Sequence, residues 1–214
     1  MTGVQTCALP ICSSERSAAL IKIAEEIDSR IPEIVAANQK DLELGRAENL
    51  NSQLMDRLLL DETRVKAIAN GARKVAKLPD PLGQTLRDRT LPNGLNLRQV
   101  TVPFGVVGMV YEARPNVTVD AAVILIRSGN AALLRGSSSA ENSNKVLVEI
   151  MRDALAKTNI SPDVLQLIPA TDRATTKALL NARGEVDLVI PRGSASLIRM
   201  VVDEATVQIG RAHV

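Results

Sequence analysis

A buried-type strand that runs straight into a polar turn is the feature that most constrains this chain. Residues 102–116 have the sequence VPFGVVGMVYEARPN, in which an apolar segment leads into Glu112, Arg114 and Asn116. A strand that is apolar on both faces is typical of a parallel sheet covered by helices on both sides. Ligands of such sheets bind beyond the carboxyl ends of the strands. We therefore expect an α/β domain from about Val102, with functional residues in this turn.

The rest of the chain after Val102 alternates between short apolar runs and helical stretches. We expect strands at residues 106–111, 131–134, 164–168 and 186–190, and helices at residues 119–127, 142–157 and 175–182. A strand every roughly 20 to 30 residues matches βαβ units, which give a parallel sheet. The polar clusters at residues 112–116, 135–139, 169–172 and 191–196 each follow one of these strands.

The region before this domain is predicted to be helical from residue 13 to residue 78. Ser14 is expected to cap a first helix, and Pro32 to begin a second helix that ends at Gly45. A third helix is expected at residues 53–59, and Asp61 is expected to cap a fourth. Apolar residues recur on one face of the first and fourth segments, and no cluster of catalytic residue types appears in the region, so we assign these helices to packing and not to chemistry.

A hairpin is predicted between the helices and the α/β domain. Pro79, Pro81 and Gly83 interrupt the helical pattern. Residues 85–90 and 95–101 then flank Asn93 and Gly94, and an Asn-Gly pair between two extended segments favours a tight hairpin turn. The domain boundaries that we expect are 13–101 for the helices and arm and 102–207 for the α/β domain, forming one structural unit.

Charge and hydropathy exclude several classes of partner. The 26 basic and 24 acidic residues nearly cancel, with a formal net charge of +2, which argues against a nucleic-acid partner. No apolar run approaches the roughly 20 residues that a membrane-spanning helix needs. The two cysteines, Cys7 and Cys12, lie close together at one end, so a disulfide framework is not expected and a cytoplasmic setting is. No metal site is expected.

Both ends of the chain differ in pattern from the rest. Residues 1–12 and 208–214 hold both cysteines and the single histidine, His213, and do not continue the neighbouring periodicity. We interpret them as a non-native leader and tail. A signal peptide is disfavoured for the leader because it has no basic start and its apolar stretch is broken by polar residues.

Two sequence strings resemble one family. YEARPNVTVD at residues 111–120 and LVIPRGSASLIRMV at residues 188–201 are similar to the gamma-glutamyl phosphate reductase family, a branch of the aldehyde dehydrogenase superfamily. The resemblance implies an aldehyde-dehydrogenase-like, atypical Rossmann domain and the NADPH-dependent reduction of gamma-glutamyl phosphate to glutamate-5-semialdehyde in L-proline biosynthesis. It covers about residues 13–207, roughly the first half of such a reductase. We therefore expect the catalytic domain and its nucleophilic cysteine to be missing and this chain alone to be inactive.

The resemblance also implies where the dinucleotide binds. No GxGxxG motif is present, and Gly105 and Gly108 do not form a phosphate loop. In the superfamily the loop after the fourth strand serves instead, here through Arg192, Gly193 and Ser194. Gly193 would allow close backbone approach, and Ser194 would present N–H groups to phosphate. The alternative is an ordinary turn in which Ser194 only caps a helix.

The end of the second strand is expected to bind the adenosine half of the cofactor. By resemblance, Arg135, with Gly136 and Ser137, faces the ribose, and a guanidinium suits a 2′-phosphate. NADP is therefore expected in place of NAD. The alternative leaves Arg135 as a solvated charge and the serines at residues 137–139 as caps of the following helix.

Three residues of the turn after the first strand are the candidates for chemistry. By resemblance, Asn116 donates its side-chain amide to the oxyanion that forms at the reacting carbonyl; otherwise it is a turn residue that satisfies its own backbone. Glu112 and Arg114 either pair with each other to brace the loop or contact the acidic substrate. Both alternatives remain open from the sequence.

Other readings of the function share these features. A different aldehyde dehydrogenase would have the same alternation and the Asn, but normally Trp or Phe before it, where this chain has Arg114 and Pro115. A synthase fused to a glutamate kinase, or a non-catalytic nucleotide-binding or oligomerising module, also fits half a chain. The resemblance implies a homo-oligomer through the hairpin arm, and a glutamate kinase is a second candidate partner.

Overall fold

The chain folds around a four-stranded parallel sheet. The computed structural model describes residues 11–170 and 172–210. The strands lie in the order β5-β4-β3-β6, and all neighbours are parallel. Their bounds are β3 Val106–Tyr111, β4 Ala131–Arg135, β5 Leu165–Leu167 and β6 Leu188–Arg192. The expected α/β fold is confirmed, and the central position of β3 explains why all six of its residues are buried.

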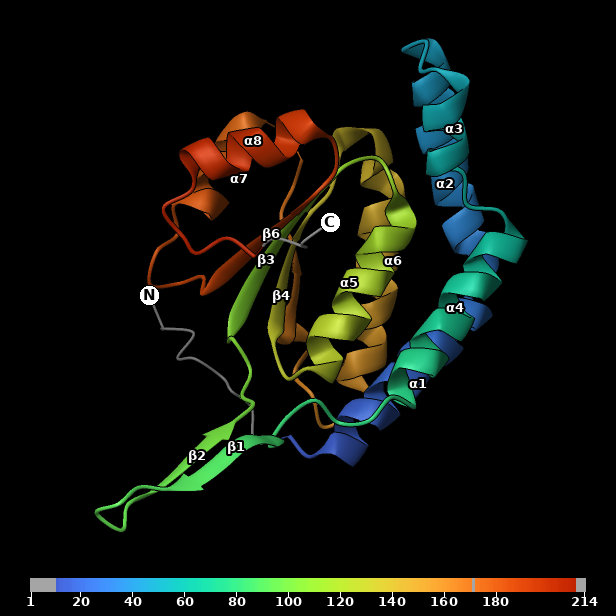
Figure 1. Cartoon of the computed structure of the whole chain (residues 1–214). Coiled ribbons are helices and arrows are strands. Elements are labelled where there is room, and N and C mark those ends of the chain that lie inside the picture. Colours follow the sequence, from blue (N-terminus) through green and yellow to red (C-terminus); the bar gives the residue numbers. More distant parts are fainter. Residues whose placement is uncertain (1–10, 171, 211–214) are drawn as a thin grey trace.

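Helices cover both faces of the sheet (Figure 1). α5 (Pro115–Arg127) and α6 (Glu141–Ala156) lie on one face, and α7 (Arg173–Leu180) and α8 (Ala195–Glu204) lie on the other. Short 3₁₀ helices, η1 (Ser138–Ala140) and η2 (Pro162–Val164), precede α6 and β5. Each face has its own aliphatic cluster, as expected for a chain with one Tyr, one Phe and no Trp.

The N-terminal helices form a further layer against α5 and α6. Their bounds are α1 Ser13–Ser29, α2 Ile31–Ala47, α3 Ser52–Leu58 and α4 Glu62–Ala76. Apolar residues of α1, α2 and α4 belong to the same core cluster as those of α5, α6 and β4, so this layer is continuous with the α/β core. Asp61 caps α4 as predicted, its Oδ1 accepting from the Arg64 N–H at 2.7 Å. Ser14 does not cap α1, because the helix begins at Ser13 and Cys12 is its N-cap.

The predicted end of the second helix at Gly45 is wrong. α2 continues to Ala47, and the residue with a left-handed backbone is Asn49, at φ 56°. Gly45 is buried for a packing reason: a Cβ built there would lie 3.0 Å from Met55 Sδ and 3.1 Å from Leu50 Cδ1. The glycine thus lets α3 and the preceding loop pack closely on α2.

The helix after β3 begins four residues earlier than predicted. Pro115 is its first residue, and Arg114 before it lies outside the helical region, at φ −147° and ψ 86°, because a proline disfavours a helical backbone in the residue before it. Asn116 therefore lies in the first turn of α5 and not in a free loop. The other predicted elements agree with the structure to within about two residues at most ends, the usual scatter of helix boundaries.

A two-stranded hairpin projects from the body of the molecule (Figure 1). β1 (Thr85–Thr90) pairs antiparallel with β2 (Asn96–Val100), which confirms the predicted arm. Gly94 has φ 84° in the turn, where the Leu91 N–H donates to the Leu95 carbonyl at 2.8 Å. Every residue of both strands is exposed in this chain.

A buried polar network fixes α3 on the core. Asn38 of α2 donates to the Leu58 carbonyl at 2.8 Å and to Ser143 Oγ at 3.0 Å, and its Oδ1 accepts from the Leu60 N–H at 2.8 Å. The Asp41 carboxylate accepts four hydrogen bonds from the first turn of α6: from the N–H and side chain of Asn142 and from the N–H and hydroxyl of Ser143. A carboxylate at a helix N-terminus is stabilised by the helix dipole, so α2, α3 and α6 are held in one register.

The two ends of the chain are only partly described. The leader 1–12 lies outside the described residues except for Ile11 and Cys12, and so do residues 211–214 of the tail. Residues 208–210 run along the free edge of β6: the Val189 N–H donates to the Gln208 carbonyl at 2.8 Å, and the Gly210 N–H donates to the Val189 carbonyl at 2.9 Å. The non-native origin of both segments stays a prediction.

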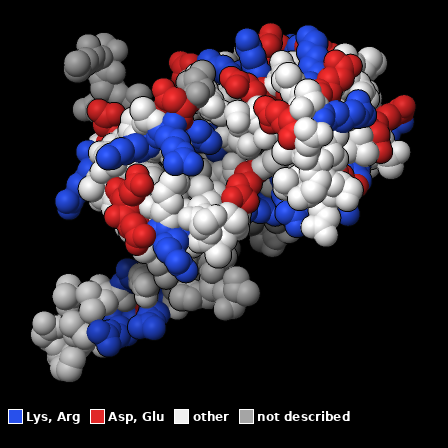
Figure 2. All heavy atoms as spheres, turned by 90° about the horizontal axis from the view of Figure 1, so that it is seen from above, with Lys and Arg blue, Asp and Glu red and all other residues white. Residues whose placement is uncertain are grey.

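The surface carries charges of both signs. Figure 2 shows groups of Lys and Arg beside groups of Asp and Glu on the face seen from above, in keeping with the small net charge. Within residues 11–170 and 172–210, no helix is long and apolar enough to cross a bilayer.

Candidate functional site

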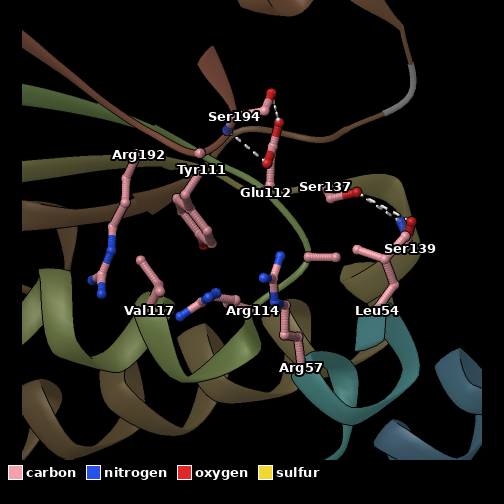
Figure 3. Close-up of a pocket in the computed structure, with 12 residues that line it drawn as sticks. Leu54, Arg57, Tyr111, Glu112, Arg114, Val117, Ser137, Ser139, Arg192 and Ser194 are labelled. Carbon is pink, nitrogen blue, oxygen red and sulfur yellow. Dashed lines mark hydrogen bonds between the residues drawn. The ribbon is translucent and has the colours of Figure 1, made fainter. Parts of the chain in front are cut away.

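The residues predicted to be functional gather at the carboxyl edge of the sheet, where three hollows adjoin. A central hollow of about 620 Å³ lies between α3, the loop after β3 and the loop after β6 (Figure 3). A second, the α7–α8 hollow, has about 690 Å³ and is lined by residues of β3, β4, α7 and α8. A third, the α3–α4 hollow, has about 590 Å³ and shares Arg57 and Arg114 with the central one.

Glu112 and Ser194 join the two loops of the central hollow. Glu112 Oε2 accepts from the Ser194 N–H at 2.9 Å, and Oε1 accepts from the Ser194 hydroxyl at 2.5 Å (Figure 3). Gly193 makes room for this contact, since a Cβ there would lie 2.7 Å from Glu112 Cδ. Ser194 is also the N-cap of α8, so the N–H that we expected to face phosphate is engaged by a carboxylate here.

Glu112 and Arg114 form no ion pair with each other in the described part of the chain. Arg114 projects into the central hollow, as do Arg57 from α3 and Arg192 from the end of β6 (Figure 3). Among residues 11–170 and 172–210, none of these three guanidiniums has a carboxylate within ion-pair distance. The hollow therefore has an excess of positive charge, because three guanidiniums and one carboxylate, that of Glu112, line it.

Asn116 lines the neighbouring α3–α4 hollow together with Asp120. Its side-chain amide donates to Asp120 Oδ2 at 3.2 Å, one turn further along α5. Burial raises the pKa of the Asp120 carboxyl above its ordinary value, against the opposing effects of the Asn116 hydrogen bond and the Arg192 charge. A half-buried amide donor fixed on a helix is suited to stabilise charge that develops during a reaction.

Arg135 lies at the carboxyl end of β4 and lines the α7–α8 hollow. Its Nη1 donates to the Gly136 carbonyl at 3.0 Å and its Nη2 to the Asp172 carbonyl at 3.2 Å, but its buried Nε has no partner in the described structure. Burial lowers the pKa of this guanidinium, and the charges of Asp172 and Glu141 oppose that effect. A half-buried cation with a donor that has no partner fits an anionic ligand.

Gly136 and Ser137 have structural roles that the sequence did not separate from binding. A Cβ at Gly136 would collide with the Asn144 amide and lie 3.1 Å from Tyr111 Cε2, so packing alone accounts for the glycine. Ser137 caps η1 by accepting from the Ser139 N–H at 3.2 Å, and both serines also line the central hollow. Their predicted contact with a cofactor stays a prediction.

Four basic residues that line these hollows were not predicted from the sequence. Arg57 and Arg64 line the α3–α4 hollow, and Arg173 and Lys177 of α7 line the α7–α8 hollow with Arg135. Arg173 and Lys177 lie near the start of α7, which follows β5, and this position after a strand could have identified them as candidates. Arg57 gave no such signal, because it lies in a helix that is distant in the sequence from every strand end.

The fold, with its loops after β3 and β6, is that of a known class of protein. The sequence pattern described as "Aldehyde dehydrogenase family" matches residues 11–214. The chain belongs to the aldehyde dehydrogenase family.

Within that family the similarity is to gamma-glutamyl phosphate reductases. The chain is 48% identical to the "Gamma-glutamyl phosphate reductase" of Thermobifida fusca (strain YX) over 210 residues, which are 96% of this chain and 50% of the relative. It is 52% identical to that of Kineococcus radiotolerans over 204 residues, or 93% of this chain and 47% of the relative. The crystal structure of the Thermotoga maritima protein of the same name superposes with a TM-score of 0.92 at 38% identity, covering 97% of this chain and 50% of that one. The chain thus spans about half the length of the relatives it matches.

Proposed function

We propose that this chain forms the nucleotide-binding half of a gamma-glutamyl phosphate reductase. Such an enzyme reduces gamma-glutamyl phosphate to glutamate-5-semialdehyde with NADPH in L-proline biosynthesis. The similarity to reductases of that name across more than nine-tenths of this chain supports the assignment. The family implies a nicotinamide cofactor, and the choice of NADPH rests on the hollow described next.

The observation that carries the cofactor proposal is the unpartnered Nε of Arg135. It lies at the carboxyl end of β4 beside Arg173 and Lys177, at the edge of the sheet where α/β proteins bind ligands. Three cationic groups around one hollow suit the 2′-phosphate that distinguishes NADPH from NADH. Arg192, Gly193 and Ser194 would then lie along the remainder of the cofactor, which supplies the hydride when bound.

Asn116 is proposed as the oxyanion donor and Arg114 as a substrate contact. Asn116 lies on the first turn of α5, held by Pro115 before it and by its hydrogen bond to Asp120. This fixed placement is what an oxyanion donor needs, because a donor that must reorient loses most of its effect. Glu112 is proposed to hold Ser194 in place through the two hydrogen bonds between them, and so to affect the site through Ser194.

The assembly and setting are also proposals. A homo-oligomer is supported by the projecting hairpin, where Leu86, Leu95, Leu97 and Val100 are exposed apolar side chains. A cytoplasmic location fits a metabolic reductase of this family. A glutamate kinase is proposed as a second partner from the proposed function alone.

The direct test compares two proteins. One is the 214-residue chain, and the other is this chain extended through the C-terminal half of the Thermobifida fusca relative. The extended protein should catalyse NADP-dependent oxidation of glutamate-5-semialdehyde in the presence of phosphate, and the chain alone should not. In the extended protein Asn116→Ala should lower turnover by about a hundredfold or more with nucleotide affinity nearly unchanged. A folded extended protein that binds NADPH but has no such activity would refute the assignment.

A further inference from the structure

We propose that Arg57 of α3 and Arg114 together bind the phosphate group of the acyl-phosphate substrate. The inference rests on the proposed function and adds a residue and a role to it. Through Arg57, α3 would contact the substrate directly.

The two guanidiniums reach the same space from different elements. Figure 3 shows the Arg57 side chain rising from α3 and the Arg114 side chain extending from the loop after β3 into the central hollow. Both residues also line the α3–α4 hollow that contains Asn116. They therefore lie between the proposed oxyanion donor and the loop of Ser194. The phosphate of an acyl phosphate is bonded to the reacting carbonyl group, so its site must adjoin that donor.

The charges around the pair leave it without a counterion in the described residues. Asp56 forms an ion pair with Arg64, with Oδ1 at 2.5 Å from Nη2, and Glu112, which accepts hydrogen bonds from Ser194, forms no ion pair with either guanidinium in the described residues. Asp120 accepts from Asn116 and is itself half-buried. Arg192, the remaining cation, lies at the β6 side of the central hollow. A dianionic phosphate would balance two guanidiniums, each of which offers a forked pair of donors that matches phosphate oxygens.

The backbone of Arg57 is fixed before any ligand arrives. Its neighbour Leu58 is fully buried, and the Leu58 carbonyl accepts from the buried Asn38 amide at 2.8 Å. At the other end of α3, Asn51 caps the helix by accepting from the Leu54 N–H at 2.9 Å. A donor on an anchored helix loses less conformational entropy on binding than one on a free loop. The exposed Arg57 side chain itself has no hydrogen-bond partner in residues 11–170 and 172–210, so its replacement should leave the fold intact.

Titration calorimetry on the 214-residue chain tests the proposal. The probe is the phosphonate analogue of gamma-glutamyl phosphate, and NADPH, L-glutamate and inorganic phosphate are titrated separately. The variants are Arg57→Ala and Arg57→Lys, with Arg46→Ala as a matched control, because Arg46 is an exposed arginine at the end of α2 that lines neither hollow. Arg57→Ala should weaken binding of the phosphonate about tenfold or more, the scale of a lost charge-assisted contact. Arg57→Lys should recover part of that loss, and Arg46→Ala should have no effect.

The separate titrations distinguish a failure of this proposal from a failure of the proposed function. If the chain binds NADPH but Arg57→Ala leaves phosphonate affinity unchanged, or the chain does not bind the phosphonate, the role of Arg57 is wrong while the cofactor assignment stands. If L-glutamate loses affinity on Arg57→Ala as strongly as the phosphonate does, the pair binds a carboxylate and the phosphate assignment is wrong. Inorganic phosphate should show the same dependence on Arg57 at lower affinity.

Discussion

The carboxylate of Glu112 occupies both donors of Ser194 at the start of α8, with contacts of 2.9 Å to the N–H and 2.5 Å to the hydroxyl. The two residues come from loops that follow neighbouring strands, β3 and β6, so the contact ties the carboxyl edge of the sheet together. It also places a negative charge where the proposed cofactor would bring phosphate. Glu112 and a phosphate cannot use the same donors at once.

Replacement of Glu112 should therefore strengthen nucleotide binding. Glu112→Gln removes the negative charge and weakens its hold on Ser194, so the dissociation constant for NADPH should fall about threefold to tenfold, the effect of one charged contact. Glu43→Gln, a change at an exposed glutamate on α2, is the control. Calorimetric titration of the 214-residue chain measures both. Weaker binding of NADPH by the Glu112 variant would mean that the carboxylate supports the cofactor and does not compete with it.

Asp41 should be among the residues most important for stability. Its buried carboxylate accepts four hydrogen bonds from the first turn of α6. Asp41→Ala leaves those donors without partners, and the free energy of unfolding should fall by about 3 kcal/mol or more. Urea denaturation gives the value, and the exposed Glu43→Ala on the same helix should change it by less than about 0.5 kcal/mol. An equal, small effect of both changes would show that the network contributes little.

The sheet and its helices could be predicted because their signals are local. Each apolar run is short, ends in a polar cluster and is followed by a helical period, and the parallel topology follows from that order. The ends of the elements were predicted less accurately. The predicted end at Gly45 was wrong because its glycine serves contacts with Met55 and Leu50, which are made in three dimensions and leave no local pattern.

From the sequence, the site could be predicted only as a group of loops at one edge of the sheet. The strand ends bring Glu112, Asn116, Arg135 and Ser194 to one edge, as the sequence indicated, but the partners of these side chains could not be derived from it. The sequence left Glu112 to pair with Arg114 or to contact substrate, and in the structure it is bound by Ser194. Arg57 was missed because its place beside Arg114 depends on how α3 packs on α2 and η1.

Asp120 should make stability depend on pH. Burial raises the pKa of this carboxyl in the folded chain, so ionisation costs stability at neutral pH, and the cost disappears as pH falls below the ordinary aspartate pKa of about 4. Asp120→Asn keeps an acceptor for the Asn116 amide but carries no charge. The variant should be more stable than the unmutated chain at about pH 7, and the difference should vanish at about pH 3 to 4.

Chemical denaturation across that range measures the effect. Asp203→Asn, at an exposed position on α8, is the control and should show no pH-dependent gain. A lower stability of Asp120→Asn at neutral pH would mean that the charge of Arg192 outweighs the cost of burial.

The most direct test of the whole account is the choice between NADPH and NADH by the 214-residue chain. Arg135 has an unpartnered Nε beside the α7–α8 hollow, and Arg173 and Lys177 add positive charge there. In titration calorimetry NADPH should bind more tightly than NADH, and Arg135→Ala should reduce the difference by about 1 to 3 kcal/mol. Arg199→Ala, at an exposed arginine of α8 that does not line this hollow, should leave the difference unchanged. Equal affinities of the unmutated chain for the two nucleotides would contradict the account.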